Sequence, residues 1–392
     1  MFKAFYKAIL PFFRGHYPTQ WLSSTTGYVA GFGEDEISRD DGLVVLEKLS
    51  LINKNGSRFS LLPLTKVLAN AELTTDLNLK DCLIEKWVKY FEETFNTETI
   101  SYSEFIWFDL EVSNLFGFLD WCLINDRANL CATLTIQCVR WFWARGYLRE
   151  LEYYLQLTYE KAKQQADSGE LLADLAYRIG DICYWRGKLT QAETFLTQYM
   201  STLEKMNQIE AKMLHACGFL ARIYANSAEF DRAKYYLNKG YQISLVLEQS
   251  GAHSLLSRVQ RYQAEVEIKA GNYDTAAKLL ENTVRLIEKD KLEESSSLAR
   301  NFAILGQVEI LRSNYEAAQT VLEGATELAN RYELKYDLAL ASQNFALLKI
   351  ATNNLDEALS YANKALSLYK QLGMELRIAE TEEIIARCKP FK

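Results

Sequence analysis

The side chains best suited to catalysis or metal binding are few in this sequence and widely spaced. The three histidines are His16, His215 and His253, and no acidic partner typical of a catalytic triad can be identified for the last two. The seven cysteines form no CxxC pair, so their spacing does not suit a zinc site. We therefore predict no metal, no cofactor and no enzymatic activity, and we interpret the cysteines as reduced, buried thiols of a cytoplasmic protein.

A phosphate-binding loop is also missing from the sequence. Such a loop follows the pattern GxxxxGK[ST], and no such run occurs. Gly27, Gly31 and Gly33 lie close together, but the acidic residues 34–36 follow them and would repel a phosphate. The 392 residues therefore contain no P-loop ATPase core.

Length and composition indicate a globular protein of two or three structural units, because 392 residues can bury a large core. The net charge of −7 argues against general nucleic-acid binding. No stretch reaches 18 apolar residues, so we expect no membrane span. No proline occurs between Pro63 and Pro390, and this long interval can therefore run as packed helices.

Five similar stretches recur in the second half of the sequence. Each has a small or polar turn, an apolar residue, two polar residues and an alanine, and the steps between the alanines are 41, 43, 42 and 40 residues; the alanines are Ala192, Ala233, Ala276, Ala318 and Ala358. A fixed period of this length marks an array of helical repeats. The turn is expected to join two antiparallel helices, with the alanine at their crossing, where only a small side chain lets the backbones approach.

The positions around each alanine repeat as well. Twelve residues before it stand small residues, Gly180, Ala221, Ala264, Gly306 and Ala346, and four residues after it stand Leu196, Leu237, Leu280, Leu322 and Ala362. This pattern resembles the tetratricopeptide repeat. The repeats here are about eight residues longer than the common form, so we expect each helix to gain a turn. Residues 379–388 are expected to form a helix that closes the array.

Residues 1–75 are predicted to form a winged-helix domain. Leu43, Leu46 and Leu49 have helical spacing. Asn55-Gly56 then separates two short β-prone runs, which is a strong hairpin signal because both central residues of the turn need a positive φ. A helix followed by a small hairpin is the arrangement of a winged helix.

Residues 41–52 (DGLVVLEKLSLI) and 55–64 (NGSRFSLLPL) resemble the winged-helix domain that follows the nucleotide-binding core of STAND-class signalling NTPases, many of which then carry tetratricopeptide repeats. Residues 111–123 and 139–151 resemble the segments that follow in those proteins. The resemblance implies an all-α protein apart from the wing, with a helical linker over 76–130 and a solenoid of about six repeats of about 42 residues over 131–392. The position where the family often offers a histidine to the nucleotide is Leu62 here, so nucleotide sensing is not expected.

Aromatic residues are dense where the linker meets the first repeat. We predict that they fill the core there, since helically spaced aromatic residues usually do. The alternative is a cage that stacks on a ligand. The residues are Trp107, Phe108, Trp121, Trp141, Phe142 and Trp143.

The resemblance also implies which residues face the concave side of the solenoid, because the first helix of each repeat lines it. By phase these are Arg140, Trp143, Tyr177, Asp181, Tyr184, Arg222, Arg258, Arg261, Arg300, Gln307 and Gln343. Arginine can hold a carboxylate bidentately, so this face is predicted to bind an acidic peptide. The alternative is that the arginines pair with neighbouring acids such as Asp181 and Glu265. The double substitution Arg258→Glu with Arg300→Glu is expected to abolish capture of a partner and to leave the fold intact.

The favoured function is a non-enzymatic protein- or peptide-binding scaffold or sensor, similar to the C-terminal half of a STAND protein without its NTPase core. Its expected partner is an acidic protein or peptide, or a separate NTPase subunit. The alternative is a transcription regulator in which the repeats control DNA binding by the winged helix. The acidic balance of residues 34–50, where only Arg39 and Lys48 are basic, disfavours this alternative because the face would repel phosphates.

Overall fold

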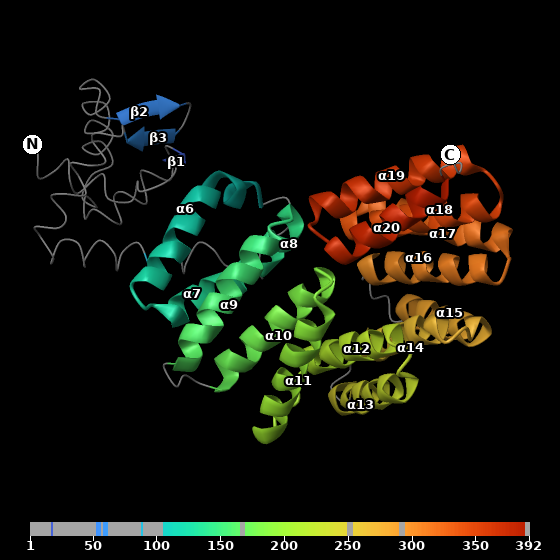
Figure 1. The fold of residues 1–392 in the computed structure, drawn as a ribbon, viewed down its shortest axis with the longest axis horizontal. Helices are drawn as coiled ribbons and strands as arrows, with labels where there is room; N and C mark the ends of the chain where they lie inside the picture. The colour runs from blue at the N-terminus through green and yellow to red at the C-terminus, as the bar shows by residue number, and fades with distance from the viewer. Residues whose placement is uncertain are drawn as a thin grey trace, which may run out of the picture. The chain divides into compact units, whose positions relative to one another are not determined.

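The computed structural model (Figure 1) describes residues 17–18, 52–55, 58–61, 88, 105–164, 169–248, 254–289 and 295–388. The protein divides into two compact units. The first comprises residues 1–144 with 160–162, and the second comprises residues 145–159 with 163–392.

The first unit contains a small antiparallel sheet of strands β1 (Tyr17–Pro18), β2 (Ile52–Asn55) and β3 (Arg58–Leu61), in the order β1-β3-β2. The hairpin predicted at Asn55-Gly56 is present as β2 and β3. Asn55 pairs with Arg58, so residues 56 and 57 connect the strands and Asn55 itself belongs to β2.

Leu43, Leu46 and Leu49, the residues with helical spacing, lie outside the described residues, and the winged-helix domain as a whole stays a prediction. In the first part of the helical linker predicted over 76–130, Val88 is the one described residue before Phe105, and it has a helical conformation.

Three helices follow in the first unit, α6 (Ile106–Ile124), α7 (Ala128–Gln137) and α8 (Val139–Arg145). Three of the aromatic residues predicted to fill the core, Phe108, Trp141 and Phe142, are buried around them. Trp141 and Phe142 are fully buried, and the Trp141 indole Nε1 donates to Asp109 Oδ1 at 3.0 Å. The Phe108 ring lies 6.2 Å from the Trp141 ring, centroid to centroid. Trp121 and Trp143 are partly buried, and the Trp107 side chain lies outside the described residues.

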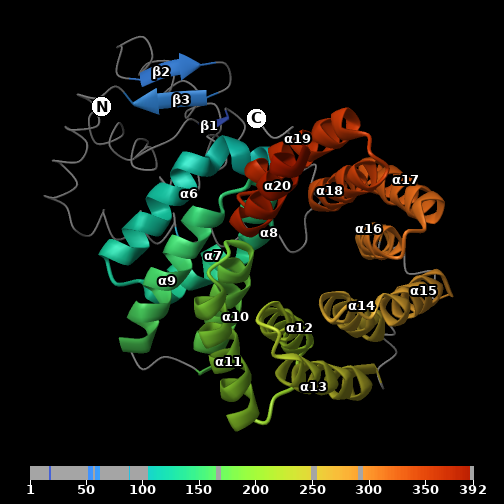
Figure 2. The same ribbon diagram turned by 45° about the vertical axis from the view of Figure 1, so that its right-hand side comes forward.

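The second unit is built from helix pairs. It begins with α9 (Leu148–Gln164) and ends with α20 (Glu375–Cys388), and the first helix of each pair between them lies on the inner side (Figure 2). The ten paired helices have 16 to 19 residues each. The pairs are α10 (Gly169–Trp185) with α11 (Leu189–Lys205), α12 (Ala211–Asn226) with α13 (Phe230–Glu248), α14 (Ser254–Lys269) with α15 (Tyr273–Lys289), α16 (Ser295–Leu311) with α17 (Tyr315–Arg331), and α18 (Lys335–Ala351) with α19 (Leu355–Gln371).

The helix crossings are those that the alanine period predicts. All five alanines of the ladder are fully buried. A Cβ added to Gly180 would lie 2.7 Å from Leu196 Cγ, and one added to Gly306 would lie 2.5 Å from Leu322 Cγ. In these two repeats the residue twelve before the alanine therefore lies against the residue four after it, and a larger side chain at the glycine would not fit.

The turn inside each pair has one repeated backbone conformation. Its second residue has a φ between 59° and 80° in every pair; these residues are Gly187, Ala228, Gly271, Ser313 and Asn353. The next N–H donates to the carbonyl five residues earlier, as from Asn354 N to Lys349 O at 2.8 Å. This Schellman arrangement satisfies carbonyl groups at the end of the first helix, and it explains why the turns use small and polar residues.

Ala228 is the turn residue least suited to its conformation, since its Cβ opposes a φ of 59°. We expect Ala228→Gly to raise the free energy of unfolding by about 0.5–1 kcal/mol in urea denaturation, because glycine removes this steric conflict. Ala351→Gly is the matched control, since Ala351 is the exposed last residue of α18, and there glycine should lower stability. Equal losses in both variants would contradict the strain at Ala228.

The repeats of the second unit curve until the end of the array meets its beginning. A Cβ added to Gly146 would lie 1.9 Å from the carbonyl oxygen of Gln371, so the two backbones are in direct contact. Arg149 and Arg186 both bond Glu375 Oε1, at 3.0 Å and 3.1 Å, although Arg149 and Glu375 are 226 residues apart in sequence. The closing helix was predicted over 379–388, and the structure shows that it begins earlier, at Glu375. Through Glu375 it contacts the first helices of this unit. The result is a closed ring of helices (Figure 2).

Candidate binding cavity

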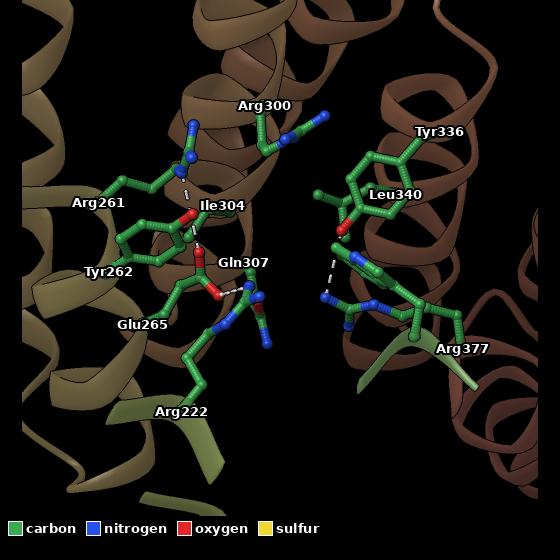
Figure 3. Close-up of a pocket in the computed structure, with 11 residues that line it drawn as sticks. Arg222, Arg261, Tyr262, Glu265, Arg300, Ile304, Gln307, Tyr336, Leu340 and Arg377 are labelled. Carbon is green, nitrogen blue, oxygen red and sulfur yellow. Dashed lines mark hydrogen bonds and ion pairs between the residues drawn. The ribbon is translucent and has the colours of Figure 1, made fainter. Parts of the chain in front are cut away.

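The ring encloses a cavity of about 50 Å³, to which α10, α12, α14, α16, α18 and α20 all contribute (Figure 3). Four guanidinium groups share it with aromatic and aliphatic walls. The lining residues are Trp185, Arg222, Arg261, Tyr262, Glu265, Arg300, Ile304, Gln307, Tyr336, Leu340 and Arg377.

Helical spacing brings these side chains to one face of each inner helix. Arg300, Ile304 and Gln307 stand at i, i+4 and i+7 on α16 and therefore share a face. Arg261 and Glu265 are one turn apart on α14 in the same way. Because each inner helix follows its predecessor by one repeat, the faces converge on the axis of the ring.

Arg222 is held by one carboxylate and a cage of aromatic rings. Its Nη1 donates to Glu265 Oε2 at 2.8 Å. The guanidinium carbon lies between 4.6 Å and 5.6 Å from the centroids of four rings, those of Tyr184, Phe219, Tyr262 and Trp185. Burial opposes its charge most strongly, but Glu265, Tyr184 and Tyr262 together outweigh burial and raise the pKa of Arg222 above its ordinary value.

Glu265 serves two arginines. Burial alone would raise the pKa of its carboxyl group, but Arg222 and then Arg261 outweigh burial and lower it. The contact with Arg261 is long, 3.9 Å from Nε to Oε1. Burial, with Arg300 and Arg222 nearby, lowers the pKa of Arg261, so its guanidinium is the least compensated of the cavity.

Arg300 and Arg377 each form an ion pair with a carboxylate that lies beside the cavity. Arg300 bonds Asp337 through Nε at 2.8 Å, and its guanidinium carbon lies 4.6 Å from the centre of the Tyr336 ring. Arg377 bonds Glu380 at 2.8 Å and donates to the Tyr336 hydroxyl at 3.4 Å. Tyr336 also packs against Trp185, with ring centroids 5.2 Å apart, so residues from opposite ends of the array meet across the ring.

His215 lies beside this cluster and links two of its neighbours. Its Nε2 is 2.8 Å from Arg258 Nη1, which must donate, and its Nδ1 is 2.9 Å from the Tyr262 hydroxyl. The imidazole is therefore neutral. Burial, and then the positive charge of Arg258, lower the pKa of His215 to about 3.

The lowered pKa makes the protein less stable in acid. The unfolded histidine has its ordinary pKa near 6.5, so as the pH falls the unfolded state takes up this proton before the folded state does. The neutral His215 imidazole therefore contributes its full stabilisation at a pH above its ordinary pKa, and this stabilisation is lost progressively as the pH falls toward 3. Between pH 7.5 and pH 5 we expect wild type to lose on the order of 1–2 kcal/mol more free energy of unfolding than His215→Gln. Urea denaturation at pH 7.5 and pH 5 measures this difference. If wild type and His215→Gln lose the same free energy of unfolding between the two pH values, the imidazole is not neutral and buried.

Of the predicted concave residues, the structure brings Arg222, Arg261, Arg300 and Gln307 together in the cavity. Tyr184 lies in the aromatic cage, and Asp181 accepts a hydrogen bond at 3.0 Å from the indole of Trp185. Tyr177 packs on Tyr199, and buried Gln343 accepts from the Tyr369 hydroxyl at 3.0 Å. Arg140 and Trp143 belong to α8 of the first unit, where the Arg140 guanidinium lies 5.9 Å from the Phe105 ring.

The alternative of paired arginines is also partly realised, because Arg222 and Glu265 form an ion pair. Arg300 pairs with Asp337, which is buried. Arg300→Glu would therefore place two carboxylates against each other, and this substitution is unsuitable for testing binding alone.

No known family profile and no curated protein matches this sequence. Solved structures do match. The first is a STAND (Signal Transduction ATPase with Numerous Domains) protein with a tetratricopeptide repeat sensor from Pyrococcus horikoshii, with 14% identity and a TM-score of 0.59 over 98% of this protein. The 392 residues span 53% of the length of that protein. The second is a Rap protein complexed with Competence and Sporulation Factor, with 11% identity and a TM-score of 0.52, covering 82% of this protein and 92% of that one.

The fold of the repeats is a tetratricopeptide-like solenoid. These similarities establish the fold alone, since the identities are far below those that would carry a function. They confirm the architecture that the alanine ladder predicts.

Sequence reasoning missed six of the residues that line the cavity, namely Trp185, Tyr262, Ile304, Tyr336, Leu340 and Arg377. Trp185, Tyr262 and Tyr336 lie on inner helices, but their positions differ from the repeat positions used to map the concave face. Arg377 lies on α20, which a repeat pattern marks only as a cap. A basic residue on the inner turn of the closing helix is the one signal that could have pointed to it.

The described part of the protein holds no group of three or more His, Cys, Asp or Glu side chains placed to bind a metal ion. Within the same residues, no helix is both long enough and apolar enough to cross a lipid bilayer.

Proposed function

We propose that this protein is a non-enzymatic, cytoplasmic sensor or scaffold module that recognises an acidic protein or peptide at the centre of its solenoid. The observation that carries the proposal is the convergence of six helices on one cavity with four guanidinium groups. Arginine is suited to this role because its planar donors match a carboxylate and stay charged when buried.

The structural similarities support a signalling context. One similar protein is a STAND ATPase whose tetratricopeptide repeats are its sensor, and the other, a Rap protein, is complexed with a factor. In our proposal residues 1–75 form a winged helix that connects the sensor to an NTPase core. The sequence itself contains no P-loop, so a separate NTPase subunit is the second partner to seek.

Gln307→Glu is the sharpest test of this function. Gln307 lines the cavity and is partly buried, so a carboxylate at this position would compete for the arginines without disturbing an existing ion pair. We expect affinity capture from the native cytosol to retain an acidic partner on wild type and to lose it at least about tenfold on Gln307→Glu.

Gln307→Leu is the control for size, and it should keep the partner because it adds no charge. If wild type and Gln307→Glu retain the same proteins to the same extent, the cavity is not the recognition site. The elution of a P-loop NTPase with wild type would identify the second class of partner.

A further inference from the structure

More arginines than carboxylates line the cavity. Four arginines line it, and Glu265 is the one carboxylate among the described lining residues. Asp337 and Glu380 bond Arg300 and Arg377 from beside it. Three carboxylates therefore bond the four guanidinium groups that line the cavity, one carboxylate fewer than there are guanidinium groups.

The shortage of carboxylates is greatest at Arg261. Its side chain is only 5% exposed, and its one ion pair among the described residues is the 3.9 Å contact with Glu265, which Arg222 already holds at 2.8 Å. Within the described residues no acceptor lies within hydrogen-bonding distance of Arg261 Nε, or of Arg222 Nε and Nη2. Buried N–H groups of this kind are unfavourable unless an acceptor satisfies them.

The shape of the cavity limits what can satisfy these groups. A volume of about 50 Å³ is sufficient for a carboxylate group. Figure 3 shows Arg222 and Arg377 reaching into this space from opposite sides. The walls formed by Trp185, Ile304 and Leu340 suit the apolar carbon atoms that carry such a group.

We infer that the cavity is a socket for a single carboxylate group of the partner, held by Arg261 together with Arg222, while the rest of the partner stays outside it. A monoanion supplies the acceptors that these two arginines lack. The inference rests on the proposed function for the natural ligand. The socket itself can be tested with small probes.

The test is isothermal titration calorimetry of the full-length protein at constant ionic strength. The probes are N-acetyl-leucine, which has a free carboxylate, and N-acetyl-leucinamide, which has the same shape without the charge. We expect the carboxylate to bind with a Kd on the order of 1 mM and the amide to bind at least about tenfold more weakly. The α-amide of N-acetylglutamate is the third probe, because its relative affinity distinguishes the carboxylate of an acidic residue from the terminal carboxylate of a peptide as the natural group.

Two variants assign the binding to the cavity. Arg261→Met should weaken binding of the carboxylate probes at least about tenfold, whereas Arg331→Met, at a largely exposed arginine that pairs with Glu327, should leave it unchanged. Gln307→Glu should also abolish it while all four arginines remain, which guards against a folding defect in Arg261→Met. Thermal melting checks the fold of each variant.

The inference is overturned if the amide binds as well as the carboxylate, if wild type binds no carboxylate probe, or if Arg261→Met binds like wild type. These results are separable from the fate of the proposed function. If the probes bind but no partner is captured, the proposed function is wrong and the carboxylate socket is supported. If wild type and Arg261→Met capture the same partner equally well, the proposed function is supported and the carboxylate socket is wrong.

Discussion

Gly146→Ala is expected to lower the free energy of unfolding by roughly 3 kcal/mol and to release the closing helix of the ring. The added Cβ would lie 1.9 Å from the carbonyl oxygen of Gln371 and 2.9 Å from its carbonyl carbon. Both are backbone atoms, so relief requires the end of α19 to withdraw, and α20 would withdraw with it. Urea denaturation measures the loss, and hydrogen exchange of α20 amides reports the release.

Gly271→Ala is the matched control for this substitution. Gly271 has a φ of 80° where Gly146 has 77°, so the backbone cost of alanine is the same at both positions. No described atom lies within 4 Å of a Cβ added to Gly271, and we expect a loss of only about 1 kcal/mol there. Equal losses in the two variants would show that the ring does not close through Gly146.

Glu265→Gln is expected to be the most damaging substitution in the cavity, with a loss of about 3–5 kcal/mol in free energy of unfolding. The amide keeps the shape of the side chain and one acceptor for Arg222 at 2.8 Å, but it removes the carboxylate that Arg222 and Arg261 share. Two buried guanidinium groups then face each other without a counter-charge. Urea denaturation at pH 7 measures the effect.

A second substitution shows whether charge causes this loss. Arg261→Met removes the less compensated cation and retains much of its volume, so adding it to Glu265→Gln should restore at least half of the lost stability. Glu327→Gln, at an exposed ion pair with Arg331, is the control and should change stability by less than about 1 kcal/mol. A double variant as unstable as Glu265→Gln alone would assign the loss to the hydrogen bond, not to the charge.

Local patterns in the sequence predict the repeats well. The Ala192-to-Ala358 ladder fixes the crossings, because a 40-residue period of small residues allows few other packings. Gly187 and Gly271 mark turns by their chemistry, and the same turn occurs at Ala228, where the residue type gives no such signal. The hairpin at Asn55 was found for the same reason, although its register is one residue away from the expected one.

The closure of the ring could not be predicted in this way. Gly146 and Gln371 are in contact because the small rotations between successive helix pairs add up along the array. A short stretch of sequence does not reveal the total rotation. An open array implies a long concave groove, whereas the closed one brings the arginines around a small cavity. Arg377 joins them for the same reason, since α20 reaches the axis only when the ring is complete.

The contact between Gly146 and Gln371 has a consequence for how this protein can evolve. An open solenoid tolerates gain or loss of a repeat, since each unit touches only its neighbours. Here one additional helix pair would carry Gln371 and Glu375 past Gly146 and Arg149, and one fewer would leave them short. Gain or loss of a helix pair would therefore break the contacts that close the ring.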